Sequence, residues 1–489
     1  MLEQFHHPVF TFFEQLCAIP HGSGNTKQIS DFLVKFAKEH AFRSVCQDEW
    51  NNVIIEVDAT DSCEQATPVI LQGHMDMVCE QNAGRCFDFV NQGLSLLTDG
   101  EYIYADGTTL GGDDAIALAM ALAIATDPAA VHPPLILMFT TDEEAGMEGA
   151  HHLDVSSIQA KRMINIDSEE EGTIICGCAG GVRSTCSIPV SFHPITEAGS
   201  LMRLSVGGLL GGHSGVDIHL ERANANVILG RILGALAADL EIQLVSVCGG
   251  MMDNAIPRES EAIFFVPTNQ EEDVRQTVCA QQRILKKEYD QTDPGLFAEL
   301  TSVEEDAANI RVMTADATER VICFLLAAPN GVQHMSTQVE HLVETSLNMG
   351  IVHTDDRAVH ITFALRSAVE SRKEALSMKL KSLTRAVRGV YEQRASYPAW
   401  EYKADSPLRD LAVRVFSEQY GTTPKLEIIH AGLECGILAG KIPDLECISI
   451  GPDIDDIHTP KERLSVASTL RVYNYLCGLL AALACEDRQ

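Results

Sequence analysis

The hydrophobic pattern of the first 182 residues alternates between helical and strand-like periods. Apolar positions recur at helical spacing over residues 25–42, and a continuous apolar run over 115–125 predicts a buried helix. Short apolar runs of strand length occur at residues 53–57, 69–72, 135–140 and 163–166. Strands that alternate with helices of this length predict an α/β fold, in which a mostly parallel sheet is covered on both faces.

The pattern changes after the segment Cys178-Ala-Gly-Gly-Val182, which we interpret as a hinge. Strands (201–206, 262–266, 359–365) then mix with amphipathic helices (224–240, 271–287), as is typical of an α+β domain. After Tyr397-Pro-Ala-Trp400 the α/β pattern returns, with a strand at 447–450 and a closing helix near 465–483. We therefore predict a discontinuous domain formed by residues 1–182 and 397–489, with residues 183–396 inserted as a second domain.

Composition and net charge indicate which classes of binding partner are not expected. The chain has 489 residues, 46% hydrophobic and 21% charged, which describes a globular protein of two or more domains. The formal net charge is −33 and no Lys/Arg-rich block occurs, so we expect neither nucleic acid nor an anionic membrane as a partner. The longest apolar runs, 115–125 and 476–485, are shorter than the roughly 20 residues that cross a bilayer.

Two further features indicate the compartment. The first residues lack the basic and apolar regions of a signal peptide. The fifteen cysteines include no CxxC pair, and the tightest spacing, Cys176-Gly-Cys178, is poor geometry for a zinc ribbon. We predict reduced, mostly buried thiols and a cytoplasmic location.

Residues that bind metals well follow four of the predicted strands. In open α/β sheets ligands bind beyond the carboxyl ends of the strands, so these side chains should meet at one edge. A fifth candidate stands at the start of the 115–125 helix, where a lone Asp would ordinarily be only a helix cap. The five candidates are His74, Asp113, Glu144, Asp167 and His458.

The composition of this set favours two metal ions. Histidine and carboxylate ligands suit zinc, cobalt or manganese better than calcium. The single-zinc helix motif HExxH is absent. One catalytic zinc uses three protein ligands, so five ligands predict two divalent ions, most simply Zn²⁺, with Co²⁺ or Mn²⁺ as alternatives and one bridging carboxylate.

The expected chemistry is hydrolysis. Two metals would hold a hydroxide between them, lower its pKa and polarise a scissile carbonyl. A general base must still move the proton of the water, and Glu143, beside the ligand Glu144, is the candidate. Asp76, two residues after His74, can reach a ring N–H of that histidine and fix its orientation.

Several segments together resemble a known family. They are Gly73–Asp76, Gly107–Asp114, Thr141–Met147, Asn165–Gly172, Cys178–Gly181, Gly211–Gly215, Asn254–Glu259, Glu344–Gly350 and His430–Gly436. The chain is similar through these motifs to the aminoacyl-histidine dipeptidases (Xaa-His dipeptidases, peptidase D), which are carnosinase-like co-catalytic di-zinc exopeptidases. The resemblance implies a zinc-exopeptidase-like catalytic domain with a mostly parallel mixed sheet, plus an inserted α+β lid domain.

The resemblance also implies metal roles. His74 and Asp167 would complete one zinc site, Glu144 and His458 the other, and Asp113 would bridge them. Glu143 matches the general base of the family and Asp76 the acid that orients a histidine. Asp114 stands where we expect Asn in close relatives, and its extra charge could alter metal affinity.

Other residues would act on the substrate. His213 in Gly-Gly-His-Ser-Gly matches a lid histidine that stabilises the tetrahedral oxyanion, although a histidine between glycines can also serve only a turn. Asn254 and Arg366 are candidate partners for the substrate carboxylate or carbonyl. His430 and Glu434 either line the substrate cleft or tie a loop.

We predict metal-dependent hydrolysis of dipeptides with unblocked N-termini, with a preference for Xaa-His dipeptides such as carnosine. The alternatives are a related di-zinc tripeptidase, a carboxypeptidase or an N-acyl amino acid hydrolase. A more distant alternative is a metal-dependent binding protein without catalysis. The expected partner is a small peptide, and the inserted domain could close over the site or form a homodimer contact.

Overall fold

The computed structural model describes residues 2–303, 310–339 and 341–486, and the chain folds as two compact units. Unit 1 comprises Met1–Cys178, Tyr402–Ile428 and Leu433–Gln489, and unit 2 comprises Ala179–Glu401 and Ile429–Gly432. The expected boundaries, 182/183 and 396/397, lie a few residues from these changeovers. The short return of the chain to unit 2 at Ile429–Gly432 was not anticipated.

An eight-stranded mixed sheet forms the centre of unit 1. Its central strands β6, β3, β7 and β23 are parallel, and antiparallel pairs flank them. In spatial order the strands are β1 (Ser44–Gln47), β2 (Val53–Val57), β6 (Leu135–Thr140), β3 (Val69–His74), β7 (Arg162–Asn165), β23 (Glu446–Ser449), β8 (Thr173–Cys178) and β22 (Lys425–Ile429). β3 and β6 are buried along their whole lengths, as the continuous apolar runs predict for strands covered on both faces.

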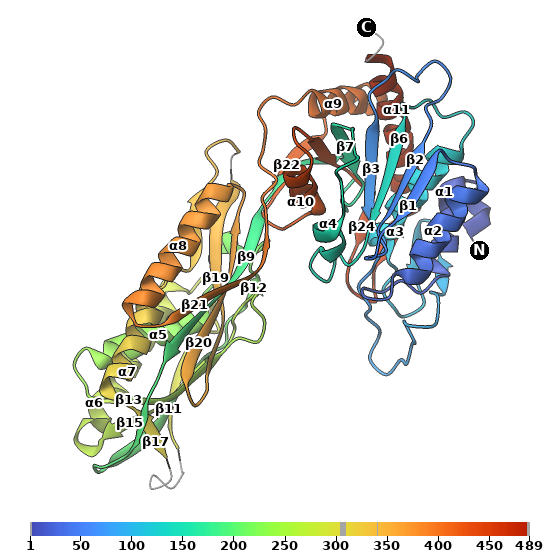
Figure 1. Ribbon diagram of the computed structural model, residues 1–489. Helices are drawn as coiled ribbons and strands as arrows, with labels where there is room; N and C mark the ends of the chain where they lie inside the picture. The colour runs from blue at the N-terminus through green and yellow to red at the C-terminus, as the bar shows by residue number, and fades with distance from the viewer. Residues whose placement is uncertain (1, 304–309, 340, 487–489) are drawn as a thin grey trace. The chain divides into compact units, whose positions relative to one another are not determined.

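Helices cover both faces of this sheet. They are η1 (Leu2–Phe5), α1 (Pro8–Cys17), α2 (Lys27–Glu39), α3 (Gly112–Thr126), α4 (Glu148–His152), α9 (Pro407–Tyr420), α10 (Glu434–Lys441) and α11 (Val466–Glu486). Figure 1 shows α1 and α2 on one side of β3 and β6, and α4 and α10 on the other. α1, α3 and α11 share one apolar core with the sheet, in which α3 is buried on nearly every side. A small sheet of β4 (Leu96–Thr98), β5 (Tyr102–Ala105), β25 (Arg463–Ser465) and β24 (Ile454–Asp455) completes the unit.

Local sequence explains where several helices start and stop. The hydroxyl of Ser406 accepts a hydrogen bond from the backbone N–H of Arg409, Pro407 occupies the first turn of α9, and Gly421 ends the helix with φ 70°. Within the described ranges, α11 is the one helix long and apolar enough to cross a membrane. Its apolar residues are instead buried in the core of unit 1, so it is a core helix here.

Unit 2 is an antiparallel sheet with helices along one side (Figure 1). Its strands in spatial order are β16 (Phe297–Ser302), β11 (Gly199–Gly207), β15 (Ser260–Pro267), β13 (Gln243–Gly249), β19 (Val343–Thr354), β20 (Ala358–Ser367), β9 (Gly180–Pro189) and β21 (Val390–Tyr397), with β18 (Gly331–Met335) paired to β19. The helices α5 (Ala225–Ala237), α6 (Glu271–Glu288), α7 (Ala315–Ala327) and α8 (Glu370–Ala386) close a separate core. Two short pairs, β12 (Gly212–His213) with β14 (Ala255–Ile256) and β10 (Phe192–Pro194) with β17 (Arg311–Met313), and the turns η2 (Ile218–Leu220) and η3 (Thr268–Gln270) complete it.

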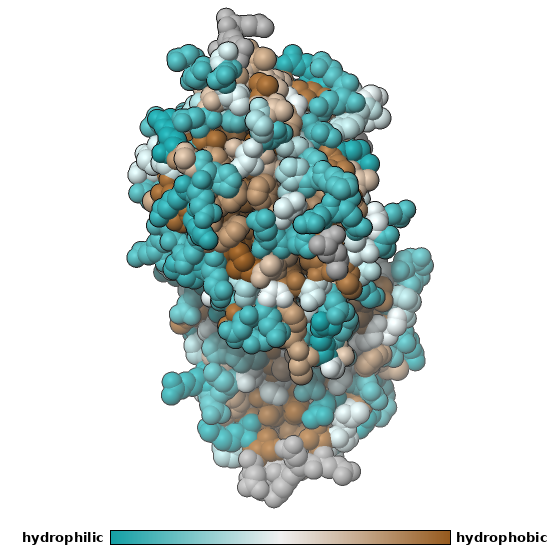
Figure 2. Space-filling model, turned by 90° about the vertical axis from the view of Figure 1, so that its right-hand side faces the viewer, coloured by the Kyte–Doolittle hydropathy of each residue, from teal (hydrophilic) through white to brown (hydrophobic). Residues whose placement is uncertain are grey.

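The segment interpreted as a hinge contains the changeover from unit 1 to unit 2, and all of it except Ala179 is strand, since β8 ends at Cys178 and β9 starts at Gly180. The expectation for the cysteines was wrong in detail. The thiols are all free, but they are not mostly buried: seven cysteines are buried, seven are exposed and Cys477 is intermediate. The face shown in Figure 2 is largely hydrophilic, with groups of apolar side chains between the polar ones.

Candidate metal centre

The carboxyl ends of the parallel strands bring the predicted ligands of unit 1 to one edge. His74 is the last residue of β3, and its Cα pairs with that of Thr140 at the end of β6. Asp167 follows the end of β7, the neighbour of β3 on the other side. His458 comes from the loop between β24 and β25, and Asp113 lies at the start of α3. Sequence positions far apart therefore meet because parallel strands end at the same edge.

Asp113 lies between the two histidines. One of its carboxylate oxygens is 3.0 Å from Nε2 of His74, and the other is 3.2 Å from Nε2 of His458. Nε2 of His74 is also 3.5 Å from an Asp167 oxygen, and Nε2 of His458 is 2.7 Å from Oε1 of Glu144. Nε2 of each histidine thus lies near one oxygen of Asp113 and near a second carboxylate, which is Asp167 for His74 and Glu144 for His458.

These spacings fit divalent ions. Two ligands at about 2.0–2.1 Å from a tetrahedral zinc lie roughly 3.3 Å apart, close to most of the distances above. Ligand atoms of His74, Asp113 and Glu144, and separately of His74, Asp114 and Asp167, lie within 4.8 Å of one another. The set of imidazole nitrogens and carboxylate oxygens also suits zinc-like ions. The residues present therefore fit a pair of such ions.

The pKa values of two proposed ligands also indicate a site for cations. Burial raises the pKa of Asp167 to about 7, and nearby Asp113 adds to the effect. Hydrogen bonds with Asp113 and Glu144 raise the pKa of His458 to about 11. Neighbouring carboxylates contribute to both shifts, while burial adds to the rise for Asp167 and opposes it for His458. Bound divalent cations would neutralise this concentration of negative charge.

Asp76 is a buried carboxylate that holds residues of the proposed metal centre in place. It is 1% exposed, and its carboxylate accepts hydrogen bonds from the backbone N–H groups of Glu143 (3.0 Å) and Glu144 (3.3 Å) and from the hydroxyl of Ser23 (2.8 Å). Its oxygen Oδ1 is 3.4 Å from Nδ1 of His74, while its backbone carbonyl is 2.9 Å from the same nitrogen. Burial would raise the pKa of Asp76, but the contacts with His74, Ser23 and Glu143 hold it below its ordinary value. Asp76 therefore remains an anion that positions three neighbours.

Glu143 and Asp114 flank the proposed ligands. Burial raises the pKa of Glu143 well above its ordinary value, and the negative charges of Asp167, Glu144 and Glu434 add to the rise. The Oδ2 atom of Asp114 accepts the backbone N–H of His74 at 3.1 Å. A Cβ atom on Gly73 would lie 2.6 Å from the same oxygen, which explains the glycine before His74.

Glu434 belongs to a buried polar network on the sheet face opposite α3. Its Oε2 atom accepts hydrogen bonds from the Gln72 amide and the Thr140 hydroxyl, both at 2.6 Å, and Gln72 in turn accepts one from the Asn165 amide at 2.5 Å. All four side chains are fully buried, while Oε1 of Glu434 has no hydrogen-bond partner. Burial raises the pKa of Glu434 to about 7.

In unit 2 the structure brings His213, Arg366 and His430 around Gly215. A Cβ atom on Gly215 would lie 3.1 Å from both Nε of Arg366 and Cε1 of His213, and 2.6 Å from the carbonyl oxygen of His430. Nδ1 of His213 accepts the backbone N–H of Val216 at 3.1 Å, so the ring proton lies on Nε2. Burial and the charge of Arg366 lower the pKa of His213, which favours this neutral form.

The remaining two substrate candidates of unit 2 differ in their surroundings. Nε2 of His430 is 2.7 Å from the Ser346 hydroxyl, and burial, with Arg366 and His213 nearby, lowers the pKa of His430 to about 3. Asn254 lies just before β14, and its backbone carbonyl accepts the N–H of Ser214 at 2.7 Å. That contact ties Asn254 to the loop that carries His213.

Comparison with known proteins identifies the family. Residues 70–482 match peptidase family M20/M25/M40. The chain belongs to this peptidase family. Members of the M20/M25/M40 family are metallopeptidases that use divalent metals, as the ligand groups of unit 1 lead one to expect.

Individual known proteins match nearly the whole chain. The cytosol non-specific dipeptidase of Escherichia coli (strain K12) is 37% identical over 473 residues, which is 97% of each protein. The crystal structure of aminoacylhistidine dipeptidase from Vibrio alginolyticus is 34% identical and superposes with a TM-score of 0.89, covering 97% of this chain and 96% of that one. A Staphylococcus aureus tripeptidase, 15% identical, shares the fold, with a TM-score of 0.56 over 99% of this chain and 98% of that one.

Several residues around the centre of this M20/M25/M40 peptidase were missed by sequence reasoning. Three of them, Gln72, Thr140 and Asn165, are polar residues near the ends of apolar strands. That position in the sequence could have indicated that they lie near the site. Ser23 and Glu462 carry no such signal, because they reach the site from distant loops.

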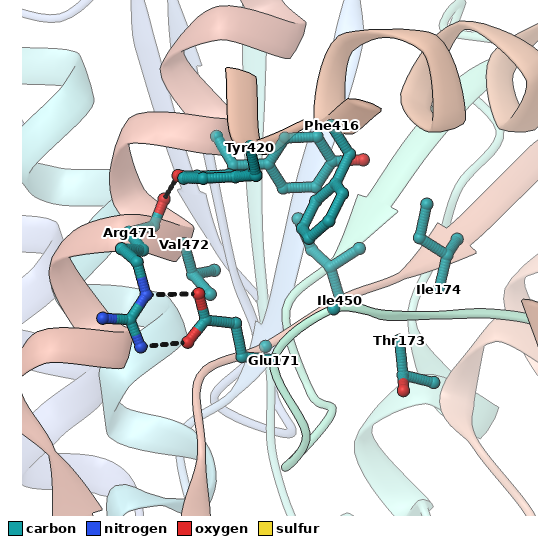
Figure 3. Close-up of a pocket in the computed structure, with 11 residues that line it drawn as sticks. Glu171, Thr173, Ile174, Phe416, Tyr420, Ile450, Arg471 and Val472 are labelled. Carbon is teal, nitrogen blue, oxygen red and sulfur yellow. Dashed lines mark hydrogen bonds and ion pairs between the residues drawn. The ribbon is translucent and has the colours of Figure 1, made fainter. Parts of the chain in front are cut away.

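A small pocket near the Asp167 loop is a structural contact rather than a second site. Figure 3 shows Arg471 paired with Glu171 and the Tyr420 hydroxyl on the Arg471 carbonyl, beside Phe416 and Ile450. Both Arg471–Glu171 distances are 2.6 Å, and the cavity of about 10 Å³ has room for roughly one water. The ion pair ties α11 to the segment that follows Asp167.

Proposed function

We propose that this chain is a metal-dependent dipeptidase that hydrolyses dipeptides with a free N-terminus and prefers Xaa-His dipeptides such as carnosine. The observation that carries the proposal is the position of Asp113, whose two oxygens lie 3.0 and 3.2 Å from the Nε2 atoms of His74 and His458. A carboxylate shared in this way is what a two-metal hydrolase needs.

His74, Asp113 and Asp167 would hold one ion, and His458, Asp113 and Glu144 the other. When bound, two such ions supply an activated water and polarise the scissile carbonyl. Glu143 takes the proton of the attacking water and passes it to the leaving amine. Its raised pKa makes it a stronger base than an ordinary carboxylate, and Asp76 fixes its backbone.

His213 is assigned the role of oxyanion donor. Its Nδ1 atom accepts the Val216 N–H, so the free Nε2–H can donate to the tetrahedral oxygen of the substrate. Burial and Arg366 lower its pKa, which keeps the ring neutral at physiological pH. A neutral donor needs no proton from solution to act.

The ends of the substrate are assigned by charge. Arg366, with the nearby His430 and with Asn254, would bind the C-terminal carboxylate of the dipeptide. Glu434 would bind the N-terminal ammonium through Oε1, its unpartnered and buried oxygen. A buried carboxylate oxygen without a donor is costly, and an ammonium group would satisfy it. This favours an unblocked dipeptide over an N-acyl amino acid.

The activities after which two relatives are named bear on the substrate of this chain. The Vibrio alginolyticus relative is described as an aminoacylhistidine dipeptidase and the Escherichia coli relative as a cytosol non-specific dipeptidase. Both support a dipeptide substrate, and the first supports the preference for C-terminal histidine. The name of the second is in line with a cytoplasmic location.

The function is tested by metal content and turnover of carnosine and other Xaa-His dipeptides, before and after chelation. Glu143→Gln should lower kcat by about 10²–10⁴-fold while leaving bound metal unchanged. Glu148→Gln is the matched control, because Glu148 lies five residues after Glu143, at the start of α4, and its side chain is exposed. This variant should keep activity. Full turnover in the chelated protein or in the Glu143 variant would refute the mechanism.

Substrate class is tested with a panel of free dipeptides, tripeptides and N-acetylated dipeptides. Free dipeptides should be cleaved fastest, with those ending in histidine first. Efficient cleavage of blocked substrates would replace the proposal with an acylase or carboxypeptidase. His213→Ala should lower kcat by about 10²–10³-fold with little change in metal content, and intact turnover would remove its oxyanion role.

A further inference from the structure

Glu462 is a buried carboxylate surrounded by backbone donors. It is 3% exposed, and its Oε2 accepts the N–H groups of Leu110 (2.8 Å) and Gly111 (3.2 Å), while Oε1 accepts that of Gly112 (2.8 Å). Three consecutive N–H groups thus converge on one side chain from about 350 residues away in sequence. Both oxygens are satisfied, so the loop before Asp113 is held at a fixed place.

The sequence of this loop is adapted to the carboxylate. Gly111 has φ 67°, and a Cβ atom there would lie 2.8 Å from Sδ of Met77. A Cβ atom on Gly112 would lie 3.3 Å from Oε1 of Glu462 itself. The two glycines therefore let the backbone approach Glu462 closely enough for all three hydrogen bonds.

Glu462 also stands next to a predicted metal ligand. It follows His458 by four residues, and a turn closes between them through the bond from the Glu462 N–H to the Thr459 carbonyl, at 3.0 Å. β25 starts at Arg463 and pairs with β5, which anchors the far side of this turn. One short segment therefore holds His458 against Asp113 and, through Glu462, also holds the backbone that leads into Asp113.

We infer that Glu462 is a positioning residue that sets the bridging carboxylate of Asp113 between the two metal sites. Its carboxylate accepts hydrogen bonds from the backbone of Leu110, Gly111 and Gly112, so it acts through that backbone. This inference rests on the two-metal site proposed above. Without Glu462, Asp113 would lose the restraint that keeps one oxygen toward His74 and the other toward His458.

The test is zinc binding to the metal-free protein, measured by calorimetry or chelator competition, with thermal unfolding in parallel. Glu462→Gln places an amide donor against backbone donors, so zinc affinity should fall by about 10–100-fold at one site or both. Glu446→Gln is the matched control, because Glu446 accepts the Leu408 N–H at the start of α9, away from the centre. It should keep wild-type zinc affinity even where its Tm falls.

The outcomes separate the two proposals. Wild-type protein that binds no zinc contradicts the proposed function itself. Wild-type protein that binds two ions, together with a Glu462→Gln variant of unchanged affinity, overturns only the positioning role, whatever happens to its Tm. If Glu462→Gln does not fold, Glu462→Asp decides: its shorter side chain should also weaken zinc binding, and wild-type affinity in that variant overturns the inference.

Discussion

At the scale of single residues, hydrogen-bond partners decide what each buried carboxylate of unit 1 can do. Asp76 accepts two backbone N–H groups and a hydroxyl, and Glu462 accepts three backbone N–H groups. Glu434 accepts only from two side chains and keeps one oxygen free. The first two are therefore fixed supports, and Glu434 is available to a ligand.

Asp76→Asn should weaken the centre. The amide offers one acceptor oxygen where the carboxylate serves the N–H groups of both Glu143 and Glu144, so one of them loses its partner. We expect zinc affinity to fall by about 10–100-fold and kcat to fall with it. Zinc titration and steady-state kinetics check this, with Ser23→Ala, which removes a single donor, as the milder comparison. Equal zinc affinities in wild type and Asp76→Asn would contradict the anchor role.

Glu434 should make the stability of the metal-free protein depend on pH. Burial raises its pKa from 4.5 to about 7, so the folded state holds a proton that the unfolded chain releases between those values. Stability contributed by this group is therefore lost as pH rises from about 4.5 to 7, by up to about 3 kcal/mol. Glu434→Gln, which resembles the protonated acid, should remove that loss.

Urea unfolding of the chelated protein at pH 5 and pH 8 measures this effect. The difference in unfolding free energy between the two pH values should be smaller in Glu434→Gln than in wild type. The exposed Glu148→Gln should show the wild-type difference. Identical pH dependence in wild type and Glu434→Gln would show that Glu434 is charged in the folded state.

At the scale of elements, the sequence predicts best the strands that end at the centre. The apolar run 135–140 coincides with β6 and the run 69–72 lies within β3, because strands buried on both faces read as continuous apolar stretches. β3 ends on the proposed ligand His74, and the proposed ligand Glu144 follows the end of β6. The end of the apolar run and the metal-ligand candidate that follows it therefore mark the same end of the strand.

Elements that depend on distant partners could not be predicted in this way. Cys178-Ala-Gly-Gly-Val182 is interpreted as a hinge because glycines break local strand preference; the chain does pass from unit 1 to unit 2 there, but the strand structure of the segment, in β8 and β9, was not anticipated. A Cβ atom on Gly181 would lie 2.4 Å from the ring of Tyr397, so the glycine makes room for the neighbouring strand β21. The contacts of Glu462 and Glu434 also join positions hundreds of residues apart, and no local pattern announces them.

Gly451→Ala should disturb the loop that contains Asp167. Gly451 follows β23, the strand next to β7, after which Asp167 lies. A Cβ atom there would lie 1.6 Å from the backbone oxygen of Ser168, the residue after Asp167. We expect a loss of roughly 1–3 kcal/mol in unfolding free energy, with weaker zinc binding. Gly478→Ala in α11 is the control, since its nearest neighbour is the flexible end of Gln419. Wild-type zinc affinity in Gly451→Ala would show that the loop tolerates the shift.

At the scale of the whole molecule, the two units have separate apolar cores, and the proposed metal ligands all belong to unit 1. Chelation should therefore lower the Tm of unit 1 and leave unit 2 unchanged. Calorimetry of the full chain with and without zinc tests this, because only some of the unfolding transitions should shift. An equal shift of every transition would contradict independent units.

The position of β23 in the sheet of unit 1 has a consequence for synthesis on the ribosome. β23 lies between β7 and β8, although both of those strands are made well before it. The nascent chain therefore keeps a gap between β7 and β8 while unit 2 emerges and closes its own core. His458 and Glu462 emerge after β23, so the acidic residues of the centre lack their second histidine until all the strands of the large sheet have been made. Zinc capture at the second site would thus follow the synthesis of that sheet.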